Sequence, residues 1–305
     1  MQMNKCVYNI NMEGKMKKMI IATDSCSDLT AEQVKTLDIR VIPLSVEIEG
    51  KSYFHYPDER EIAIKDFYQL LRDKKVAKTS LINVGKFLEF FEVFIKEDVE
   101  VLYIGFSSAL SGTFHSSQIA AGELKEQYPN SKIVTVDSLC ASMGQGLLVW
   151  HASQLAKSGN SIDEIAEWIE STKLNICHLF TVDDLGTLKR GGRLSESAAF
   201  LGTLLKVKPI LHVSNEGKLV PVKKARGRSS SLSTMVEMME KKITNSKDQT
   251  IFISHGDCLD EALLVGKMIQ DKYQVKDIIY NHIGPIIGAH SGPGTIAVFF
   301  LGNER

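Results

Sequence analysis

The stretch that decides the fold is Val99-Glu-Val-Leu-Tyr-Ile-Gly-Phe106, an apolar run with the length of a buried strand. Residues 84–95 precede it with apolar side chains at helical spacing, and a second helical pattern follows over residues 113–128. A strand enclosed by two helices indicates a parallel sheet, because parallel neighbours are joined by crossover helices.

The same alternation continues on both sides of this stretch. Further strands are predicted at residues 19–22, 41–48 and 133–136, and further helices after the capping box of Thr30 and Gln33 and over residues 64–71 and 143–156. The alternation predicts an N-terminal α/β domain, residues 19–165, with a parallel, doubly wound sheet. Residues 1–18 scatter apolar side chains among Lys, Asn and Glu and lack an apolar signal core, so we interpret them as a disordered or non-native extension.

The second half of the chain shows a different pattern. The turn Ser214-Asn-Glu-Gly217 separates two short apolar runs and indicates a hairpin of antiparallel strands. The predicted elements are a helix capped by Ser161 and Glu164, strands at 176–182, 209–213, 219–222, 251–254, 278–281 and 295–301, and helices at 232–243 and 259–273. Hairpin strands beside helices predict a C-terminal domain, residues 166–305, with a mixed α+β sheet.

The composition argues against several classes of function. Lys and Arg number 36 against 37 Asp and Glu, and a net charge of -1 argues against a nucleic-acid partner, because phosphate binding needs a basic face. No apolar run approaches the roughly 18 residues of a membrane span. The five cysteines are odd in number and show no C-x-x-C spacing. They predict neither a disulfide framework nor a zinc site, and they favour the reducing cytoplasm.

Two acidic residues follow the first predicted strand, where open α/β sheets bind ligands. Asp28 is expected to cap the next helix. For Asp24 two roles stay open, helix capping and catalysis in a phosphotransferase. Cys26 occupies the position at which the second acid of such a phosphotransferase site is expected. The G-x-x-x-x-G-K-[ST] phosphate loop does not occur in the sequence.

Hydroxyl side chains are dense before two predicted helices, at Thr79-Ser80 and over Ser107–Thr113. Free N–H groups at a helix N-terminus, with hydroxyl donors added, suit an anion, and ordinary helix capping is the alternative. Basic residues gather in Lys189–Arg193 and Lys223–Arg228, both predicted to be loops. Solvated surface charge is the ordinary explanation of such runs, and docking to an acidic partner or to anionic groups is the other.

A serine hydrolase is a further alternative. Gly105-Phe-Ser107-Ser-Ala109 approaches the G-x-S-x-G nucleophile elbow but lacks its last glycine. His290 would then serve as the base and Asp257 would orient it. His290 lies among four glycines and two prolines in residues 284–294, which predicts a tightly turned loop whose backbone approaches a ligand.

The order of these segments carries more information than any one of them. The ordered set comprises Thr23-Asp-Ser25 with Asp28-Leu29, Thr79-Ser80, Leu110-Ser-Gly-Thr113, Leu188-Lys-Arg-Gly-Gly-Arg-Leu194, Lys208-Pro-Ile210, Lys224-Ala-Arg226, Ile283-Gly-Pro285 and Gly288-Ala-His-Ser-Gly-Pro-Gly294. From residue 19 to the C-terminus the chain resembles the DegV family. It departs from the family where Leu81-Ile82-Asn83 replaces the usual proline after the Thr-Ser pair, and where Ser291 replaces the usual threonine.

The resemblance implies two α/β domains with a long-chain fatty acid, such as palmitate or oleate, bound between them. It implies a carrier without a cofactor and without turnover of its own, which presents the carboxylate to a fatty acid kinase for acyl-phosphate formation. The implied head-group contacts are Thr79, Ser111 and His290, with Ser80 beside them, and the implied kinase contacts are Arg226 and Arg193.

A dry tunnel suits such a ligand, because each buried CH₂ contributes roughly 0.8 kcal/mol. We expect the Phe-rich helix over residues 84–95 to help wall it. The alternatives are an esterase or thioesterase that uses Ser107 or Ser111, and a phosphotransferase that uses Asp24.

Overall fold

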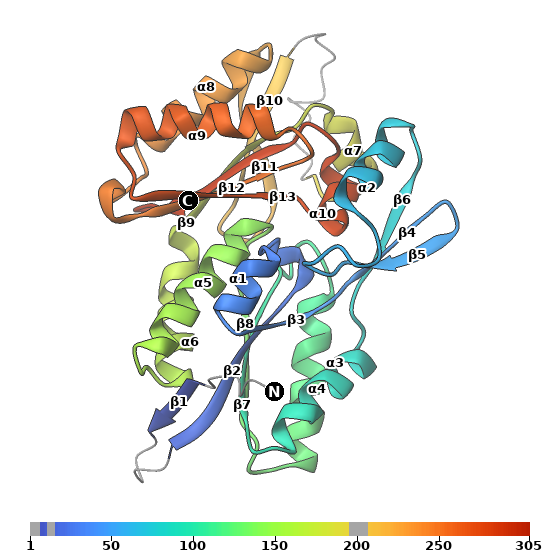
Figure 1. The fold of residues 1–305 in the computed structure, drawn as a ribbon, viewed down its shortest axis with the longest axis vertical. Coiled ribbons are helices and arrows are strands. Elements are labelled where there is room, and N and C mark those ends of the chain that lie inside the picture. Colours follow the sequence, from blue (N-terminus) through green and yellow to red (C-terminus); the bar gives the residue numbers. More distant parts are fainter. Residues whose placement is uncertain (1–6, 11–15, 195–206) are drawn as a thin grey trace.

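The N-terminal half is built on a parallel sheet, as its alternating strands and helices predict. The computed structural model describes residues 7–10, 16–194 and 207–305. The parallel strands lie in the order β3 (Ile39–Ile42), β2 (Met16–Asp24), β7 (Glu100–Gly105) and β8 (Ile133–Asp137). Residues 101–104 of β7 are fully buried, because helices cover both faces of this sheet (Figure 1).

The helices of this half pack in pairs. One face of the sheet carries α3 (Val84–Ile95) and α4 (Thr113–Gln127), and the other carries α5 (Met143–Lys157) and α6 (Ile162–Thr172) (Figure 1). The predicted capping boxes begin α1 (Ala31–Thr36) and α6. Helix α6 runs past residue 165 and packs on β7 and β8, so the chain leaves the first sheet after residue 172.

Strand β1 (Val7–Ile10) pairs antiparallel with the start of β2 at Met16, so part of the expected extension 1–18 has strand structure. Residues 1–6 and 11–15 lie outside the described residues. One prediction for this half is wrong. The predicted strand at 41–48 is two strands, β3 and β4 (Ser45–Ile48), which belong to different sheets. Pro43 separates them, because proline has no N–H to donate to a sheet.

A small antiparallel sheet projects from the N-terminal half (Figure 1). Its strands lie in the order β5 (Lys51–Phe54), β4 and β6 (Ala77–Ser80), and α2 (Ile64–Arg72) precedes β6 along the chain. The sequence pattern predicts α2 but neither β5 nor β6. Glu49 and Gly50 have φ angles of 52° and 73°, which is typical of the two-residue turn that joins hairpin strands.

The C-terminal half is built on a mixed sheet, which confirms the second fold prediction. Its six strands lie in the order β11 (Leu219–Arg226), β10 (Val207–Val213), β9 (Ile176–Thr181), β14 (Ile296–Leu301), β12 (Thr250–His255) and β13 (Asp277–His282). Among these pairs only β12 and β13 are parallel, and the predicted hairpin joins β10 to β11. Helices α8 (Arg228–Met239) and α9 (Leu259–Tyr273) cover the face away from the first sheet (Figure 1).

Three segments predicted to be loops have regular structure. Lys189 and Arg190 end α7 (Leu185–Arg190), and residues 223–226 end β11. The Gly-rich segment contains α10 (Pro285–Ser291). Pro285 suits the first turn of a helix, where its missing N–H costs nothing, and Gly292 ends the helix with a φ of 80°.

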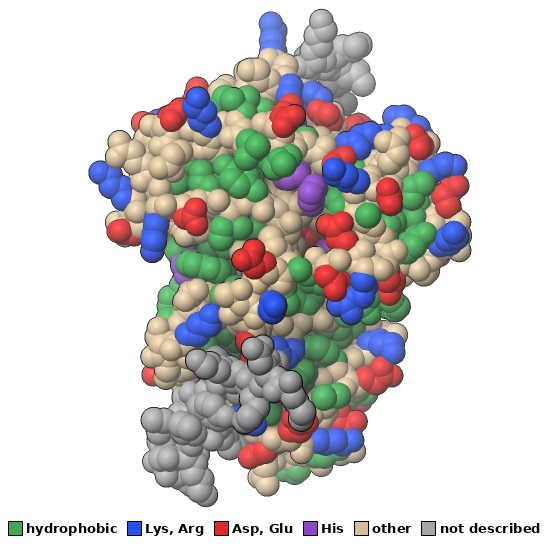
Figure 2. Space-filling model, in the orientation of Figure 1, with side chains coloured by type: hydrophobic (Ala, Val, Ile, Leu, Met, Phe, Trp, Pro, Cys, Tyr) green, Lys and Arg blue, Asp and Glu red, His purple; other side chains and the backbone are tan. Residues whose placement is uncertain are grey.

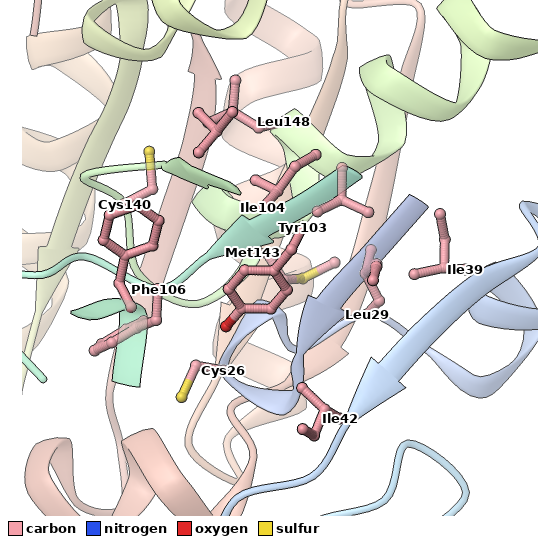
Figure 3. Close-up of a cluster of buried hydrophobic side chains, with 14 of the residues drawn as sticks. Cys26, Leu29, Ile39, Ile42, Tyr103, Ile104, Phe106, Cys140, Met143 and Leu148 are labelled. Atoms are coloured by element: carbon pink, nitrogen blue, oxygen red, sulfur yellow. The ribbon is translucent and has the colours of Figure 1, made fainter. Parts of the chain in front are cut away.

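One buried apolar cluster joins the two halves. Figure 3 shows Tyr103 and Ile104 of β7 with Leu29, Met143 and Leu148 in this cluster. The same cluster includes Phe299 of β14 in the C-terminal sheet. On the face shown in Figure 2, acidic and basic side chains are interspersed, as the balanced charge of the chain predicts.

Candidate ligand-binding site

A cavity of about 220 Å³ lies between the two halves. Its wall is mainly apolar and comes from both sheets. The apolar contributors include Phe106, Leu110, Phe180, Val213, Ile286 and Phe299. The loops after β7 and β8 reach it, as expected for the carboxyl edge of a parallel sheet.

One side of the cavity wall is polar because β6 and α10 meet there. The Thr79 Oγ1 atom lies 2.9 Å from Nε2 of His290, although the two residues are 211 positions apart. Thr79 is in β6, and His290 is in the last turn of α10. Both side chains are half-buried and line the cavity, so two of the predicted head-group residues are in contact.

The imidazole of His290 is held closely on its other edge by Gly191. A Cβ atom at position 191 would lie 2.5 Å from Nδ1 of His290. Burial, and to a smaller extent the positive charge of Arg193, lowers the pKa of His290 to about 4. The ring is therefore neutral at pH 7, with one nitrogen that donates and one that accepts.

Three other predicted residues line the same cavity. Ser111 is half-buried, and its Oγ atom accepts a hydrogen bond from the N–H of Thr113 at 3.2 Å. Ser80 is exposed at the end of β6. Arg193 donates to the carbonyls of Leu110, at 3.3 Å, and Gly191, at 2.6 Å.

The two arginines predicted to face a partner differ in position. Arg226 is exposed at the end of β11, paired with Val207, and is not among the described residues that line the cavity. Arg193, by contrast, is half-buried and lines the cavity wall. Its backbone partners explain this position, because they connect the segment after α7 to the loop after β7.

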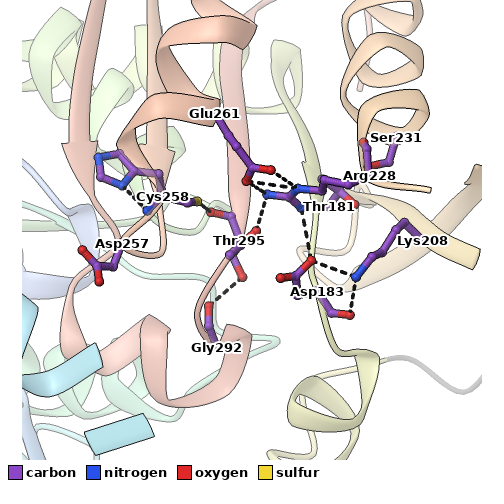
Figure 4. A network of polar contacts seen from close by, with 12 residues as sticks. Thr181, Asp183, Lys208, Arg228, Ser231, Asp257, Cys258, Glu261, Gly292 and Thr295 are labelled. Atoms are coloured by element: carbon purple, nitrogen blue, oxygen red, sulfur yellow. Dashed lines mark hydrogen bonds and ion pairs between the residues drawn. The ribbon is translucent and has the colours of Figure 1, made fainter. Parts of the chain in front are cut away.

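A polar network holds the segment that follows α10 on the C-terminal sheet (Figure 4). Arg228 lies 2.6 Å from the carboxylate of Glu261 and donates to the carbonyl of Gly294. Asp183, just after β9, accepts a hydrogen bond from Lys208 at 2.8 Å. The backbone between α10 and β14 is thereby fixed close to the polar side of the cavity.

The residues of a serine hydrolase are not brought together. Ser107 is buried and donates to the carbonyl of Gly217 at 2.9 Å. Asp257 pairs with Arg72 at 2.6 Å, and His290 contacts Thr79 instead. The described geometry therefore gives Ser107 no base.

The acids after the first strand have structural contacts. Asp24 is fully buried, accepts from the hydroxyl of Tyr103 and from backbone N–H groups, and caps the short helix η1 (Ser25–Ser27). Burial raises its pKa. The prediction that Asp28 caps α1 is wrong, because Thr30 caps that helix and the Asp28 carboxylate contacts Ser142 and Gly284.

The expectation that the Phe-rich helix walls the cavity is also wrong. Phe87 and Phe91 of α3 pack on the ring of Tyr103, with centroids 5.1 and 5.9 Å away. The described residues that line the cavity include none from 84–95. The apolar side chains of α3 therefore pack on the sheet and not on the cavity.

Polar residues in the cavity wall that the sequence did not predict include Cys26, Ser142, His178 and Ser291. Ser291 is buried, and within the described parts of the chain its Oγ atom has no hydrogen-bond partner. Two features of the sequence mark Ser291: it follows His290, and it precedes Gly292, the residue that ends the helix. No pattern in the sequence marks the other three.

The fold and this cavity define a class: a two-unit α/β protein that encloses a mainly apolar ligand site with one polar side. In the described ranges no helix is long and apolar enough to cross a membrane. Nor do His, Cys, Asp and Glu side chains in those ranges form a group of three that could hold a metal ion.

The chain belongs to the DegV family. Residues 18–303 match the family model described as "Uncharacterised protein, DegV family". A DegV domain-containing protein of Clostridium perfringens is 48% identical over 290 residues, which cover 95% of this chain and 99% of that protein.

Solved structures show the same fold. A DegV family protein from Thermus thermophilus, described as fatty-acid-binding, matches with a TM-score of 0.84 and 28% identity over 92% of this chain and 98% of that one. DegV of Bacillus subtilis, described as a fatty acid binding protein, matches with a TM-score of 0.81 and 30% identity over 92% and 98% of the two chains.

Proposed function

We propose that this protein binds a long-chain fatty acid, such as palmitate or oleate, in the cavity between its two halves. It presents the carboxylate to a fatty acid kinase, which forms the acyl phosphate, and it has no turnover of its own. It acts in the cytoplasm, which the spacing of its cysteines favours. The observation that carries the proposal is a mainly apolar cavity with the contact between Thr79 and His290 in its wall.

The chemistry of the cavity suits an amphipathic anion. An acyl chain gains roughly 0.8 kcal/mol per buried CH₂ against walls such as Phe106 and Phe299. The carboxylate needs donors, which Thr79, Ser111 and one N–H of the neutral His290 supply, with Ser80 beside them. The positive charge of Arg193 in the cavity wall favours an anion at this end.

The kinase contact is assigned to Arg226. Its side chain is exposed at the end of β11, and an exposed charge of this kind acts mainly on the rate and salt dependence of association. Arg193 contributes from the cavity wall, where its side chain is half-buried.

The fatty acid content of the purified protein tests the binding proposal. Solvent extraction and gas chromatography should find close to one fatty acid per chain, and delipidated protein should take up added oleate. His290→Ala should weaken oleate binding about 5- to 150-fold, from the roughly 1–3 kcal/mol that the loss of one hydrogen-bond partner costs. His115→Ala, at an exposed position of α4, is the matched control and should bind like the wild type.

Two results would contradict this proposal. One is protein without extractable fatty acid that also fails to take up oleate or palmitate. The other is hydrolysis of a p-nitrophenyl ester that disappears in Ser107→Ala or Ser111→Ala, which would favour the esterase.

A further inference from the structure

Helix α10 belongs to the C-terminal half of the sequence but packs on elements of the N-terminal half. The hydroxyl of Tyr68, in α2, donates to the carbonyl of Ile283 at 2.8 Å, just before the helix begins. Gly288 lies against the same side chain, since a Cβ atom there would be 2.7 Å from the Tyr68 oxygen. The position of His290 therefore depends on how the first half holds α10.

The start of α10 is held by Asp28. One carboxylate oxygen of Asp28 accepts the N–H of Gly284 at 3.0 Å, and the other accepts the hydroxyl of Ser142 at 2.5 Å. The backbone carbonyl of Asp28 accepts from Nδ2 of Asn281 at 2.7 Å. Asp28 thus holds both Asn281, near the end of β13, and Gly284, the residue just before α10.

The hydrogen bond between Asp28 and Gly284 joins distant parts of the chain and is shielded from water. Gly284 is 256 residues from Asp28, and the Asp28 side chain is buried. A Cβ atom at Gly284 would lie 2.8 Å from the Asp28 carboxylate and 2.0 Å from the ring of His55, so only glycine allows this approach. His290 lies six positions after Gly284, about 9 Å along the helix axis.

We propose that Asp28 is a positioning residue, whose side chain fixes the start of α10 on the N-terminal half and thereby fixes His290 beside Thr79. The proposal rests on the proposed function in one respect, the role of His290 in holding the carboxylate of the fatty acid. Its geometric part concerns the protein alone.

The shape of the Asp28 side chain matters more than its charge. The titratable groups around it are Asp24, Cys26, Tyr68 and His55, and none of these is a cation that pairs with it at neutral pH. An asparagine offers the same acceptor to Gly284 and an N–H₂ group to Ser142. The Ser142 hydroxyl can accept that N–H and donate to Ser254, whose Oγ atom is 2.9 Å away.

The test compares Asp28→Ala with Asp28→Asn in the full delipidated chain. Proteins labelled with ¹⁵N-histidine report the ring nitrogens of His290, whose signals are assigned by their loss in His290→Gln. Asp28→Ala should shift these signals and weaken oleate binding at least tenfold. Asp28→Asn should leave the signals in place and the affinity within about twofold of the wild type.

Asp24→Asn is the matched control. Asp24 is an equally buried carboxylate on the same segment, but its partners, which include Tyr103 and Gln145, lie in the N-terminal half. Its substitution should leave the His290 signals unchanged even if the melting temperature falls. If Asp28→Ala does not fold, Asp28→Ser takes its place, because a serine hydroxyl is too short to reach both Gly284 and Ser142.

Unchanged His290 signals in Asp28→Ala would overturn the proposal, and so would equal shifts in Asp24→Asn. Equal loss of affinity in Asp28→Asn and Asp28→Ala would also overturn it, because charge rather than shape would then decide. A wild-type chain that binds no oleate contradicts the proposed function, whereas the histidine signals still decide the role of Asp28.

Discussion

Gly191→Ala tests the placement of His290 by adding a single methyl group. Gly191 has φ and ψ of -71° and -9°, which alanine adopts without strain, so only the new contacts matter. The added Cβ atom would lie 2.5 Å from Nδ1 of His290 and 3.3 Å from its Cγ. Contacts as short as 2.5 Å are not tolerated, and the neighbour is a ring atom rather than a flexible chain end, so the ring must move.

Gly191→Ala should lower both the stability of the protein and its affinity for oleate. Overpacking of a well-filled site costs typically 1–3 kcal/mol of stability. A displaced ring also loses its 2.9 Å contact with Thr79 and its place beside the ligand. A hydrogen bond to a charged group is worth about 1.5–3 kcal/mol, so oleate should bind Gly191→Ala about 10- to 150-fold more weakly.

Calorimetric titration of delipidated protein with oleate measures this change. Gly122→Ala in α4 is the control, because a Cβ atom there meets nothing within 4 Å. It should bind normally and gain up to about 1 kcal/mol of stability, since alanine is the better helix former. Wild-type affinity in Gly191→Ala would refute the reasoning, because His290 would then not be needed in its observed position.

Three further predictions concern other residues. Thr79→Val keeps the shape of the side chain but loses the hydroxyl beside His290, so oleate titration should show binding about 5- to 150-fold weaker, and unchanged affinity would contradict this. Arg226→Ala should purify with its fatty acid, yet support little acyl-phosphate formation with the cognate kinase and ATP; an empty preparation would place Arg226 in the cavity. Burial raises the pKa of Asp28 from 3.8 to about 7, so the folded state binds this proton more tightly than the unfolded chain. Its contribution to stability is therefore lost as pH rises from about 4 through 7. Urea unfolding should show the wild type losing about 2 kcal/mol relative to Asp28→Asn between pH 5 and 7, and a constant difference would contradict the raised pKa.

The parts of the fold that the sequence predicts well are those with strong local signals. The capping boxes at Thr30 and Ser161 predict where α1 and α6 begin, because side chain and backbone satisfy each other within four residues. The apolar run at 99–106 predicts β7, because a strand buried on both faces has apolar residues throughout.

The missed elements depend on distant partners. Strand β6 is the four residues Ala77–Ser80, of which two are exposed, and it forms a strand because β4 pairs with it. Helix α10 is short, contains Gly288, a poor helix former, and is held by Tyr68 and Asp28 from the other half of the chain. No local pattern reports such contacts.

The candidate site divides in the same way. The resemblance to a family implied that Thr79, Ser111 and His290 act together, and the cavity is lined by all three. Spacing alone could not predict this, because residues 211 positions apart meet only through the packing of β6 on α10. The wall residues Ser142 and His178 were missed for the same reason. Ser142 lies just before α5 and His178 lies within β9, and only the packing of these elements brings them to the cavity.

The most direct test of the central claim is a crystal structure of the protein loaded with oleate. The account predicts an acyl chain in the cavity between the two halves, with the carboxylate within hydrogen-bonding distance of Thr79 Oγ1, Ser111 Oγ and a ring nitrogen of His290. A carboxylate bound away from these three side chains, or oleate bound outside this cavity, would contradict it.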